Sequence, residues 1–214
     1  MKSILVATPC GDLVHTAYSQ SIVENVLYLV SKKYSCSITY MPMFETYIHN
    51  GRIEIVRHAK KINATHIIWV DSDMCFPAHS FYQLLNHELD FVGVNYSTRR
   101  SPHRFTAANR NEDLGTFITV PTTEHYSTGL ESVDGIGFGL CVTSVSLFDK
   151  IQEPWFRYTY VEEKNRYRGE DYQFCLDIKK YTNVYVDHDL SKEVLHFGSI
   201  GYNYKCPFVS DKHS

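Results

Sequence analysis

Several features that would assign this chain to a special class of protein are missing from its sequence. No apolar stretch approaches the roughly 20 residues that a membrane-spanning helix needs, so we expect no membrane span. The formal net charge is only −3, which leaves no basic excess for binding nucleic acid or an anionic membrane. Internal repeats and low-complexity segments are also missing. These absences leave an ordinary globular protein.

The six cysteines form no C-x-x-C pair, and most lie among apolar neighbours. We therefore expect reduced, buried thiols in a reducing compartment. The first residues, Met1 to Val6, hold an apolar run too short for a secretory signal, and they are typical of a strand. Together these features predict a soluble, cytoplasmic protein, which would lie in the host cytoplasm if the chain is viral.

The first 95 residues alternate between two hydrophobic patterns. Short apolar runs typical of buried strands occur at residues 3–8, 36–41, 65–70 and 91–94. Segments with helical spacing lie between them at residues 18–33, 52–61 and 81–85, with a turn expected at Asn50-Gly51. This alternation predicts an α/β fold with a doubly wound, mostly parallel central sheet flanked by helices.

The pattern changes after residue 96. Residues 97–130 are polar, with basic side chains at Arg99, Arg100 and Arg104, and we expect a loop-and-hairpin excursion on the acceptor side. The glycine-rich segment 134–140 precedes a strand-like run instead of following one, so a dinucleotide site is excluded in favour of tight packing or close approach to a substrate. A helix opens at Gly169, a strand follows at residues 184–186, and the tail looks irregular.

The most informative stretch is Thr65 to Pro77, where a continuous apolar run ends in Asp71-Ser72-Asp73. Such a strand is typical of a parallel sheet covered on both faces, and its carboxyl end is where α/β proteins bind ligands. Side chains at positions i and i+2 of an extended segment point the same way, so the two carboxylates can converge on one cation. The alternative is a loop in which one aspartate caps the helix near Pro77.

Five segments in sequence order resemble the GT-A class of nucleotide-sugar glycosyltransferases, including those encoded by chloroviruses. They are Thr8-Pro9-Cys10, Asp71-Ser72-Asp73, the glycine-rich segment 134–140, Pro154-Trp155-Phe156 followed by Gly169-Glu170-Asp171, and His196-Phe197-Gly198. The resemblance runs from Ser3 to about Lys205. It implies one GT-A domain over residues 1–214, with a nucleotide-binding half (1–96) and an acceptor and sugar half that includes a metal-binding tail (97–214).

The resemblance also implies a metal site and a nucleotide site. Asp71, Asp73 and His196 would hold the metal, and an imidazole among oxygen ligands favours Mn²⁺ over Mg²⁺. The residues expected to contact a UDP-sugar donor are Thr8, Pro9, Cys10, Arg57, Asp71, Ser72, Gly198 and Lys205. In this set Arg57 would reach the nucleotide or brace Asp71, with simple surface solvation as the alternative.

Glu170 and Asp171 would face the transferred sugar and the acceptor as the catalytic carboxylates. In an inverting enzyme one of them is the general base, and in a retaining enzyme it orients the sugar and stabilises an oxocarbenium-like state. The alternative is a structural role, because acids in a first helical turn complement the helix dipole. The chlorovirus-encoded enzymes are grouped with the retaining ones, and we expect retention on that basis.

The resulting hypothesis is a metal-dependent glycosyltransferase that moves a hexose or deoxyhexose from a UDP-sugar to a glycan acceptor hydroxyl. Three alternatives stay open. A nucleotidyltransferase shares the fold, but residues 8–15 hold one glycine and no lysine or arginine where its basic signature loop belongs. A non-catalytic sugar-binding module would have no need of two carboxylate motifs, and a metal-dependent phosphohydrolase would release phosphate.

Overall fold

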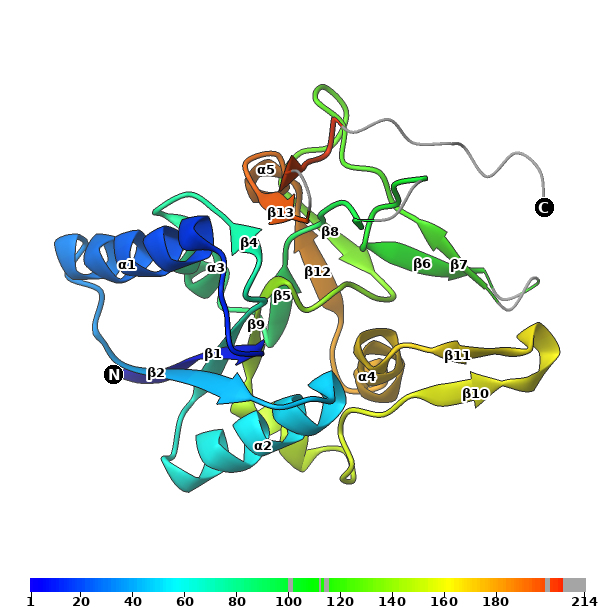
Figure 1. The fold of residues 1–214 in the computed structure, drawn as a ribbon, viewed down its shortest axis with the longest axis horizontal. Helices are drawn as coiled ribbons and strands as arrows, with labels where there is room; N and C mark the ends of the chain where they lie inside the picture. Colours follow the sequence, from blue (N-terminus) through cyan, green and yellow to red (C-terminus); the bar gives the residue numbers. More distant parts are fainter. Residues whose placement is uncertain (100–101, 112, 114–115, 199–200, 206–214) are drawn as a thin grey trace.

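The computed structural model describes residues 1–99, 102–111, 113, 116–198 and 201–205 (Figure 1). Arg100 of the basic excursion and Cys206, the last of the six cysteines, lie outside the described residues. The five described cysteines are free thiols, two of them buried. None of the described helices is long and apolar enough to cross a membrane.

A seven-stranded sheet forms the centre of the described chain, in the order β2-β1-β3-β9-β5-β12-β8. The strands are β1 (Lys2–Cys10), β2 (Cys36–Phe44), β3 (His66–Val70), β5 (Phe91–Gly93), β8 (Leu130–Val133), β9 (Leu140–Ser144) and β12 (Val184–Asp187). β1 runs parallel to β2 and β3, and β5 runs parallel to β12. β9 is antiparallel to both β3 and β5, so these two strands share a direction. Only β8 and β9 oppose the rest, and the sheet is mainly parallel.

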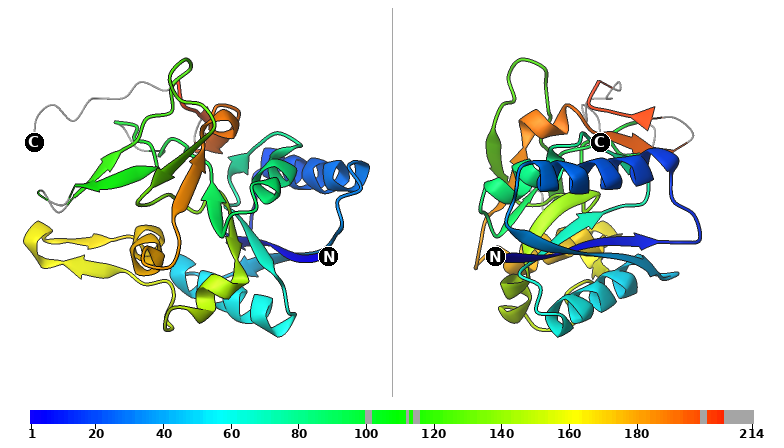
Figure 2. Two further views of the ribbon diagram at one scale, coloured as in Figure 1. Left: turned by 180° about the vertical axis from the view of Figure 1, so that it is seen from behind. Right: turned by 90° about the vertical axis from the view of Figure 1, so that its left-hand side faces the viewer.

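Helices cover both faces of this sheet (Figures 1 and 2). α2 (Ile48–Lys61) and α4 (Glu170–Ile178) pack on one face, and α1 (Thr16–Ser31), α3 (Ser80–Asn86) and α5 (His188–Ser191) pack on the other. Leu5 belongs to the first core and Ile4 to the second, because side chains alternate across a strand. The predicted fold class, an α/β fold with a mainly parallel sheet flanked by helices, is confirmed.

Two predictions about local structure are wrong. Asn50-Gly51 lies inside α2 instead of forming a turn, since Gly51 lets the helix approach the end of β2: a Cβ there would meet the Glu45 Cβ at 3.3 Å. The tail is also more regular than expected. β13 (Leu195–Phe197) pairs with β14 (Gly201–Tyr202) and with β4 (Met74–Cys75) in a small sheet. Tertiary contacts explain both differences: α2 packs closely on the segment after β2, and β13 pairs with β4. Neither contact is visible in a local sequence pattern.

Two hairpins extend from the body of the fold on the side of α4 (Figure 1). β6 (Ala108–Asn111) and β7 (Thr116–Thr119) form the first, within the predicted excursion. β10 (Thr159–Val161) and β11 (Arg166–Arg168) form the second, joined by the short 3₁₀ helix η2 (Glu162–Lys164). A 3₁₀ helix, η1 (Val145–Asp149), follows β9 directly.

Candidate functional site

The two aspartates follow β3 directly, at the carboxyl edge of the parallel part of the sheet. The pairing of β13 with β4 sets His196 opposite Met74, and the Phe197 amide donates to the Asp73 carbonyl at 2.8 Å. His196 is thereby held beside the Asp73 carboxylate, with Nε2 3.4 Å from Oδ1. The short strand in the tail is therefore what joins two motifs far apart in sequence.

A hollow of about 310 Å³ opens over these side chains. Its lining comes from the loop after β1, the segment after β2, the aspartate turn and the excursion: Pro9, Cys10, Gly11, Glu45, Thr46, Ile48, Asp71, Ser72, Asp73, Arg99 and His196. Six of the residues predicted for donor and metal binding therefore share one surface: Pro9, Cys10, Asp71, Ser72, Asp73 and His196. A 310 Å³ hollow at the carboxyl ends of the strands suits a small polar ligand.

The protonation of His196 follows from its two neighbours. Nδ1 lies 2.9 Å from the Ser97 carbonyl oxygen, and a carbonyl only accepts, so Nδ1 carries the hydrogen and donates it. In the neutral ring this leaves Nε2 with a free lone pair directed at Asp73. A histidine that ligates a metal is usually oriented by such a bond from its other nitrogen.

Arg52 connects the aspartates to the acceptor side of the site. Its side chain is buried, at 2% exposure, and Nη1 donates to Glu170 Oε1 at 2.6 Å while Nη2 lies 3.5 Å from Asp71 Oδ1. The guanidinium also lies over the Phe138 ring, 4.9 Å from its centroid. One buried cation thus holds a carboxylate from the β3 end and a carboxylate from the start of α4.

The prediction that Arg57 reaches the nucleotide or braces Asp71 is wrong. Arg57 is half exposed and pairs with Glu54 and Glu153 on the outer side of α2, so the surface alternative holds. Arg52 does the bracing instead. The helical spacing carried this signal, because Arg52 shares the buried face of Val56 and Ala59 at intervals of four and three residues, and Arg57 does not.

The two aspartates have opposite electrostatic environments. Burial raises the pKa of Asp71, and the Arg52 charge offsets this only in part. Burial also acts to raise the pKa of Asp73, but the hydrogen bond and charge of His196, together with Arg99, outweigh it and the pKa is lowered. Arg99 contacts Asp73 Oδ2 at 2.6 Å. Asp73 is therefore the more firmly ionised of the two.

The donor set of two carboxylates and an imidazole fits a divalent cation by its chemistry. Asp71 Oδ1 is buried without a hydrogen-bond partner, but it lies 3.5 Å from Arg52 Nη2 and so faces that guanidinium. Among the described residues, however, no three side chains of His, Cys, Asp or Glu already stand in a ligating arrangement. A cation would have to draw Asp73 and His196 together from their ion-pair distance of 3.4 Å.

The two predicted catalytic carboxylates lie in different surroundings. Glu170 is buried and is held by Arg52, whereas Asp171 is half-buried and accepts only from the Tyr172 amide, at 2.7 Å. Burial, followed by the neighbouring Glu170 charge, raises the pKa of Asp171 to about 6, with Arg52 acting against the rise. Of the pair, Asp171 is the group with free carboxylate capacity near neutral pH.

The glycine-rich segment supports the site by packing, not by approaching a substrate. A Cβ at Gly137 would lie 2.4 Å from the Tyr96 hydroxyl oxygen, and one at Gly139 would lie 2.6 Å from the Tyr96 ring. The Tyr96 ring in turn meets His196 edge-on, with centroids 5.0 Å apart. The glycines therefore make room for the ring that positions the histidine.

A solved structure is similar to this chain over its whole length. The crystal structure of A197 from STIV matches with a TM-score of 0.52 at 15% identity, over 100% of this chain and 99% of that one. The two chains share a fold. No protein-family model matches the sequence, and no curated protein matches it.

Two other solved structures are more distantly similar. A glycosyltransferase involved in the glycosylation of the major capsid of PBCV-1 matches with a TM-score of 0.33 at 14% identity, over 72% of this chain and 69% of that one. A 4-diphosphocytidyl-2C-methyl-D-erythritol synthase from Anaerococcus prevotii matches with a TM-score of 0.41 at 10% identity, over 86% and 87%. Likenesses this slight bear on neither activity nor substrate, so the function must be argued from the site itself.

The remaining predicted donor residues lie around the hollow or away from it. Thr8 is buried and bonds the Tyr18 hydroxyl, one position before the loop that lines the hollow. Gly198 is exposed just after β13. Lys205 is exposed and pairs with Glu124 at 3.1 Å, so the structure does not bring it to the aspartates. Arg99 is the cation that lines the hollow, and its place in the basic cluster 99–104 was the only sequence signal for it.

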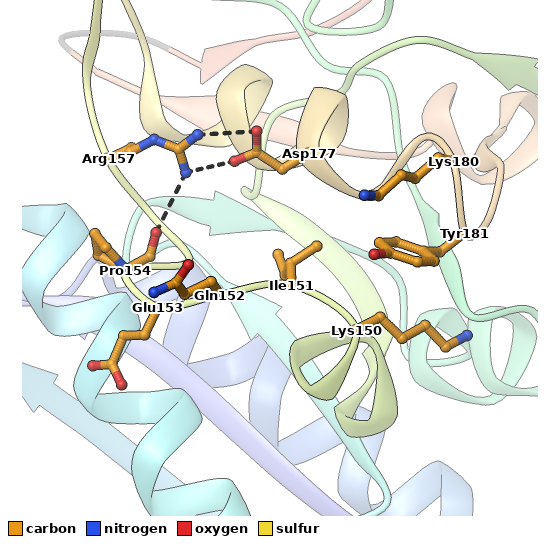
Figure 3. A pocket seen from close by; sticks show the side chains of 9 residues that line it. All are labelled: Lys150, Ile151, Gln152, Glu153, Pro154, Arg157, Asp177, Lys180 and Tyr181. Atoms are coloured by element: carbon orange, nitrogen blue, oxygen red, sulfur yellow. Dashed lines mark hydrogen bonds and ion pairs between the residues drawn. The ribbon is translucent and has the colours of Figure 1, made fainter.

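Another hollow, of about 510 Å³, is lined by residues 150–154 and Arg157, which follow η1, and by Asp177, Lys180 and Tyr181 at and beyond the end of α4 (Figure 3). Its arginine is occupied: Arg157 donates to both oxygens of Asp177, at 2.6 and 3.0 Å, and to the Pro154 carbonyl at 3.4 Å. An arginine held on three sides has little left for a ligand. The smaller hollow over Asp71 and Asp73 is the better candidate for chemistry.

Proposed function

We propose that this chain is a metal-dependent glycosyltransferase of the GT-A type, which moves a hexose or deoxyhexose from a UDP-sugar to a glycan acceptor hydroxyl. One observation supports the proposal most strongly. Asp71, the ionised Asp73 and His196, whose Nε2 faces Asp73, all line one hollow at the carboxyl edge of the sheet. That donor set suits a divalent cation that carries a diphosphate.

In this proposal Asp71, Asp73 and His196 hold Mn²⁺, or Mg²⁺. When bound, the cation supplies Lewis-acid stabilisation of the charge that develops on the departing UDP. Arg99, at the rim of the same hollow, is placed to contact the diphosphate once it releases Asp73. The loop at Pro9 and Cys10 forms the wall where the resemblance seats the uracil.

The acceptor chemistry falls to Asp171. Glu170 is committed to Arg52 and keeps that cation between the two carboxylate motifs, so its role is positioning. An ionised Asp171 serves either mechanism: it takes the acceptor proton in an inverting enzyme, or stabilises a cationic sugar in a retaining one. We propose retention from the resemblance to the chlorovirus-encoded enzymes, and the anomeric configuration of the product tests it.

Product analysis tests the proposal directly. The protein is incubated with UDP-sugars, Mn²⁺ and a mixture of oligosaccharides, and released UDP is measured beside phosphate and pyrophosphate. Release of UDP with transfer of the sugar is expected. Asp73→Asn should abolish it, whereas Asp149→Asn, which removes an exposed carboxylate paired with Lys60, should not.

Each alternative has a different product. Pyrophosphate formed from a nucleoside triphosphate and a sugar phosphate would show a nucleotidyltransferase. Inorganic phosphate as the first product would show a phosphohydrolase. Tight binding of a UDP-sugar with neither hydrolysis nor transfer, across a panel of acceptors, would show a binding module. Any of these three results overturns the proposed activity.

A further inference from the structure

The hairpins β6–β7 and β10–β11 extend from the same side of the fold (Figures 1 and 2). Residues of both hairpins and of the start of α4 line a hollow of about 340 Å³. Gly169 and Tyr172, which flank the two predicted catalytic carboxylates in sequence, both line it. Asp171 is not itself a lining residue, but it lies between these two residues at the start of α4. The hollow over Asp71 and Asp73 shares no lining residue with it, so the two are separate binding surfaces.

The cations of this second hollow come from one face of a strand. Arg166 and Arg168 are two residues apart on β11, so their side chains project from the same face, which they share with Val161 opposite Arg166. Lys164 precedes them at the hairpin turn, and all four line the hollow. On the facing hairpin, Arg110 is the register partner of Phe117, another lining residue.

These positive charges have few negative neighbours. Within the part of the chain that the structure describes, no carboxylate forms an ion pair with Arg110, Arg166 or Arg168. Arg168 is half-buried and donates to the neutral amide of Gln173 at 2.9 Å. The acids whose charges act on Arg168 are Asp177 and Glu163, and Asp177 already binds Arg157 through both oxygens. Asp134 accepts from the Arg110 amide at 2.7 Å, and it is paired with Lys179. The cluster therefore keeps an unused capacity for an anion.

Electrostatics agree with this geometry. Burial lowers the pKa of Arg168, and the charges of Arg110 and Arg166 lower it further, against the opposite effect of Asp177. Like charges placed around one hollow repel each other, and an anionic ligand would remove that cost. Aromatic rings form the rest of the wall: Phe117 meets Tyr172 edge-on at 4.8 Å, and Tyr167 is exposed beside them.

We propose that this hollow binds the acceptor, and that the acceptor is an anionic glycan bearing a carboxylate or a phosphate ester. The inference rests on the proposed transferase function and adds the class of acceptor to it. The guanidinium forks of Arg166 and Arg168 match the geometry of both anions, and they leave the aromatic wall to the sugar rings. Such an acceptor would present its hydroxyl to the adjacent Asp171.

Binding measurements with four probes test the proposal. Isothermal titration calorimetry compares a galacturonate tetrasaccharide, a mannose oligosaccharide ending in a 6-phosphate, a neutral galactose tetrasaccharide and an acidic peptide of alternating Glu and Gly. At least one anionic glycan should bind, and the neutral one should bind about tenfold more weakly or not at all. The stronger of the two anionic glycans identifies carboxylate or phosphate as the natural group.

Variants locate the binding. Arg166→Gln and Arg168→Gln should each weaken the anionic glycan by about tenfold, while Lys61→Gln, which removes an exposed charge at the end of α2, should not. Equal binding of the neutral and anionic glycans, unchanged affinity in both arginine variants, or tighter binding of the peptide than of either glycan would overturn the proposal.

A parallel titration with UDP and Mn²⁺ separates this inference from the proposed function. If the wild-type protein binds the anionic glycans but not UDP, the proposed transferase function is contradicted and the anion site still holds. UDP binding without any binding of the anionic glycans would leave the donor site standing and contradict the acceptor class.

Discussion

Arg52 is the residue on which both carboxylate motifs depend. It is buried between Asp71 and Glu170, and no other cation contacts either acid among the described residues. Asp73 has two neighbours of its own: Arg99, and His196, whose ring is positive only when Nε2 is protonated. The site therefore has an inner group of ion pairs, in which Arg52 holds Asp71 and Glu170, and an outer ion pair between Arg99 and Asp73 that a ligand can replace.

Arg52→Met should therefore be strongly destabilising. It leaves two buried carboxylates without their cation, and breaking a buried pair in this way costs about 3–5 kcal/mol of the free energy of unfolding. Urea denaturation monitored by circular dichroism measures the loss. Arg57→Met is the matched control on the same helix, and it should leave the denaturation midpoint nearly unchanged because its partners are exposed. Equal losses in both variants would contradict the bracing role of Arg52.

Asp171 gives the site a pH dependence. Its pKa of about 6 lies above the ordinary value of 3.8, so the folded state binds the proton more tightly than the unfolded chain does. Ionising Asp171 in the folded state therefore lowers the free energy of unfolding. This loss is absent below about pH 4, grows between pH 4 and 6, and is complete above pH 6. Sugar transfer needs the ionised form and should rise through pH 6 to a plateau.

The measurement is the initial transfer rate and the UDP affinity from pH 4.5 to 8, for wild type and Asp171→Asn. The variant should lose transfer, keep UDP binding, and lose less stability between pH 4 and 6 than wild type does. A variant that transfers sugar at the wild-type rate would make Asp171 a structural group of the helix start.

At the scale of elements, the site depends on contacts between segments far apart in the chain. β4 and β13 have only two and three residues, yet their pairing brings His196 to Asp73. The glycine-rich segment before β9 fixes Tyr96, whose ring contacts His196 and whose hydroxyl accepts from the Gly139 amide at 3.0 Å.

Gly139→Ala tests this second support. The added methyl group would overlap the Tyr96 ring, and such overpacking costs about 1–3 kcal/mol. We expect a lower melting temperature together with weaker UDP binding in Mn²⁺, since the displaced ring carries His196 with it. Gly11→Ala is the control for stability, because nothing lies within 4 Å of its added carbon. Unchanged UDP affinity in a destabilised Gly139→Ala would separate the packing from the metal site.

The sequence predicted those parts of the structure that local patterns encode. The apolar run of β3 and the spacing of Asp71 and Asp73 carry their own periodicity, so the central strand and the carboxylate pair were both expected. Helical spacing favours Arg52 for the buried face of α2, yet Arg57 was the arginine predicted to brace Asp71. The burial of Arg52 and the exposure of Arg57 show that this prediction is wrong. β13 was missed because a three-residue strand has no period, and its partner β4 lies far away in the sequence.

At the scale of the whole molecule, the donor and the acceptor are proposed to bind in two separate hollows, with the start of α4 between them. The first holds the carboxylates and His196 at the edge of the sheet, and the second lies between the two hairpins. Arg52 and Glu170 link the first hollow to α4, and Asp171 lies where α4 begins. The central claim is that the first hollow binds a nucleoside diphosphate together with a divalent metal ion.

Calorimetry of UDP binding in Mn²⁺ and in EDTA tests that claim most directly. The account predicts binding in Mn²⁺ that weakens by at least about tenfold, roughly 1.4 kcal/mol, when the metal is removed. It also predicts that Asp73→Asn shows the weak affinity in both conditions with its melting temperature nearly unchanged, because an amide is a poorer ligand for a hard cation than a carboxylate. Equal UDP affinity in Mn²⁺ and in EDTA for the wild-type protein would contradict the account.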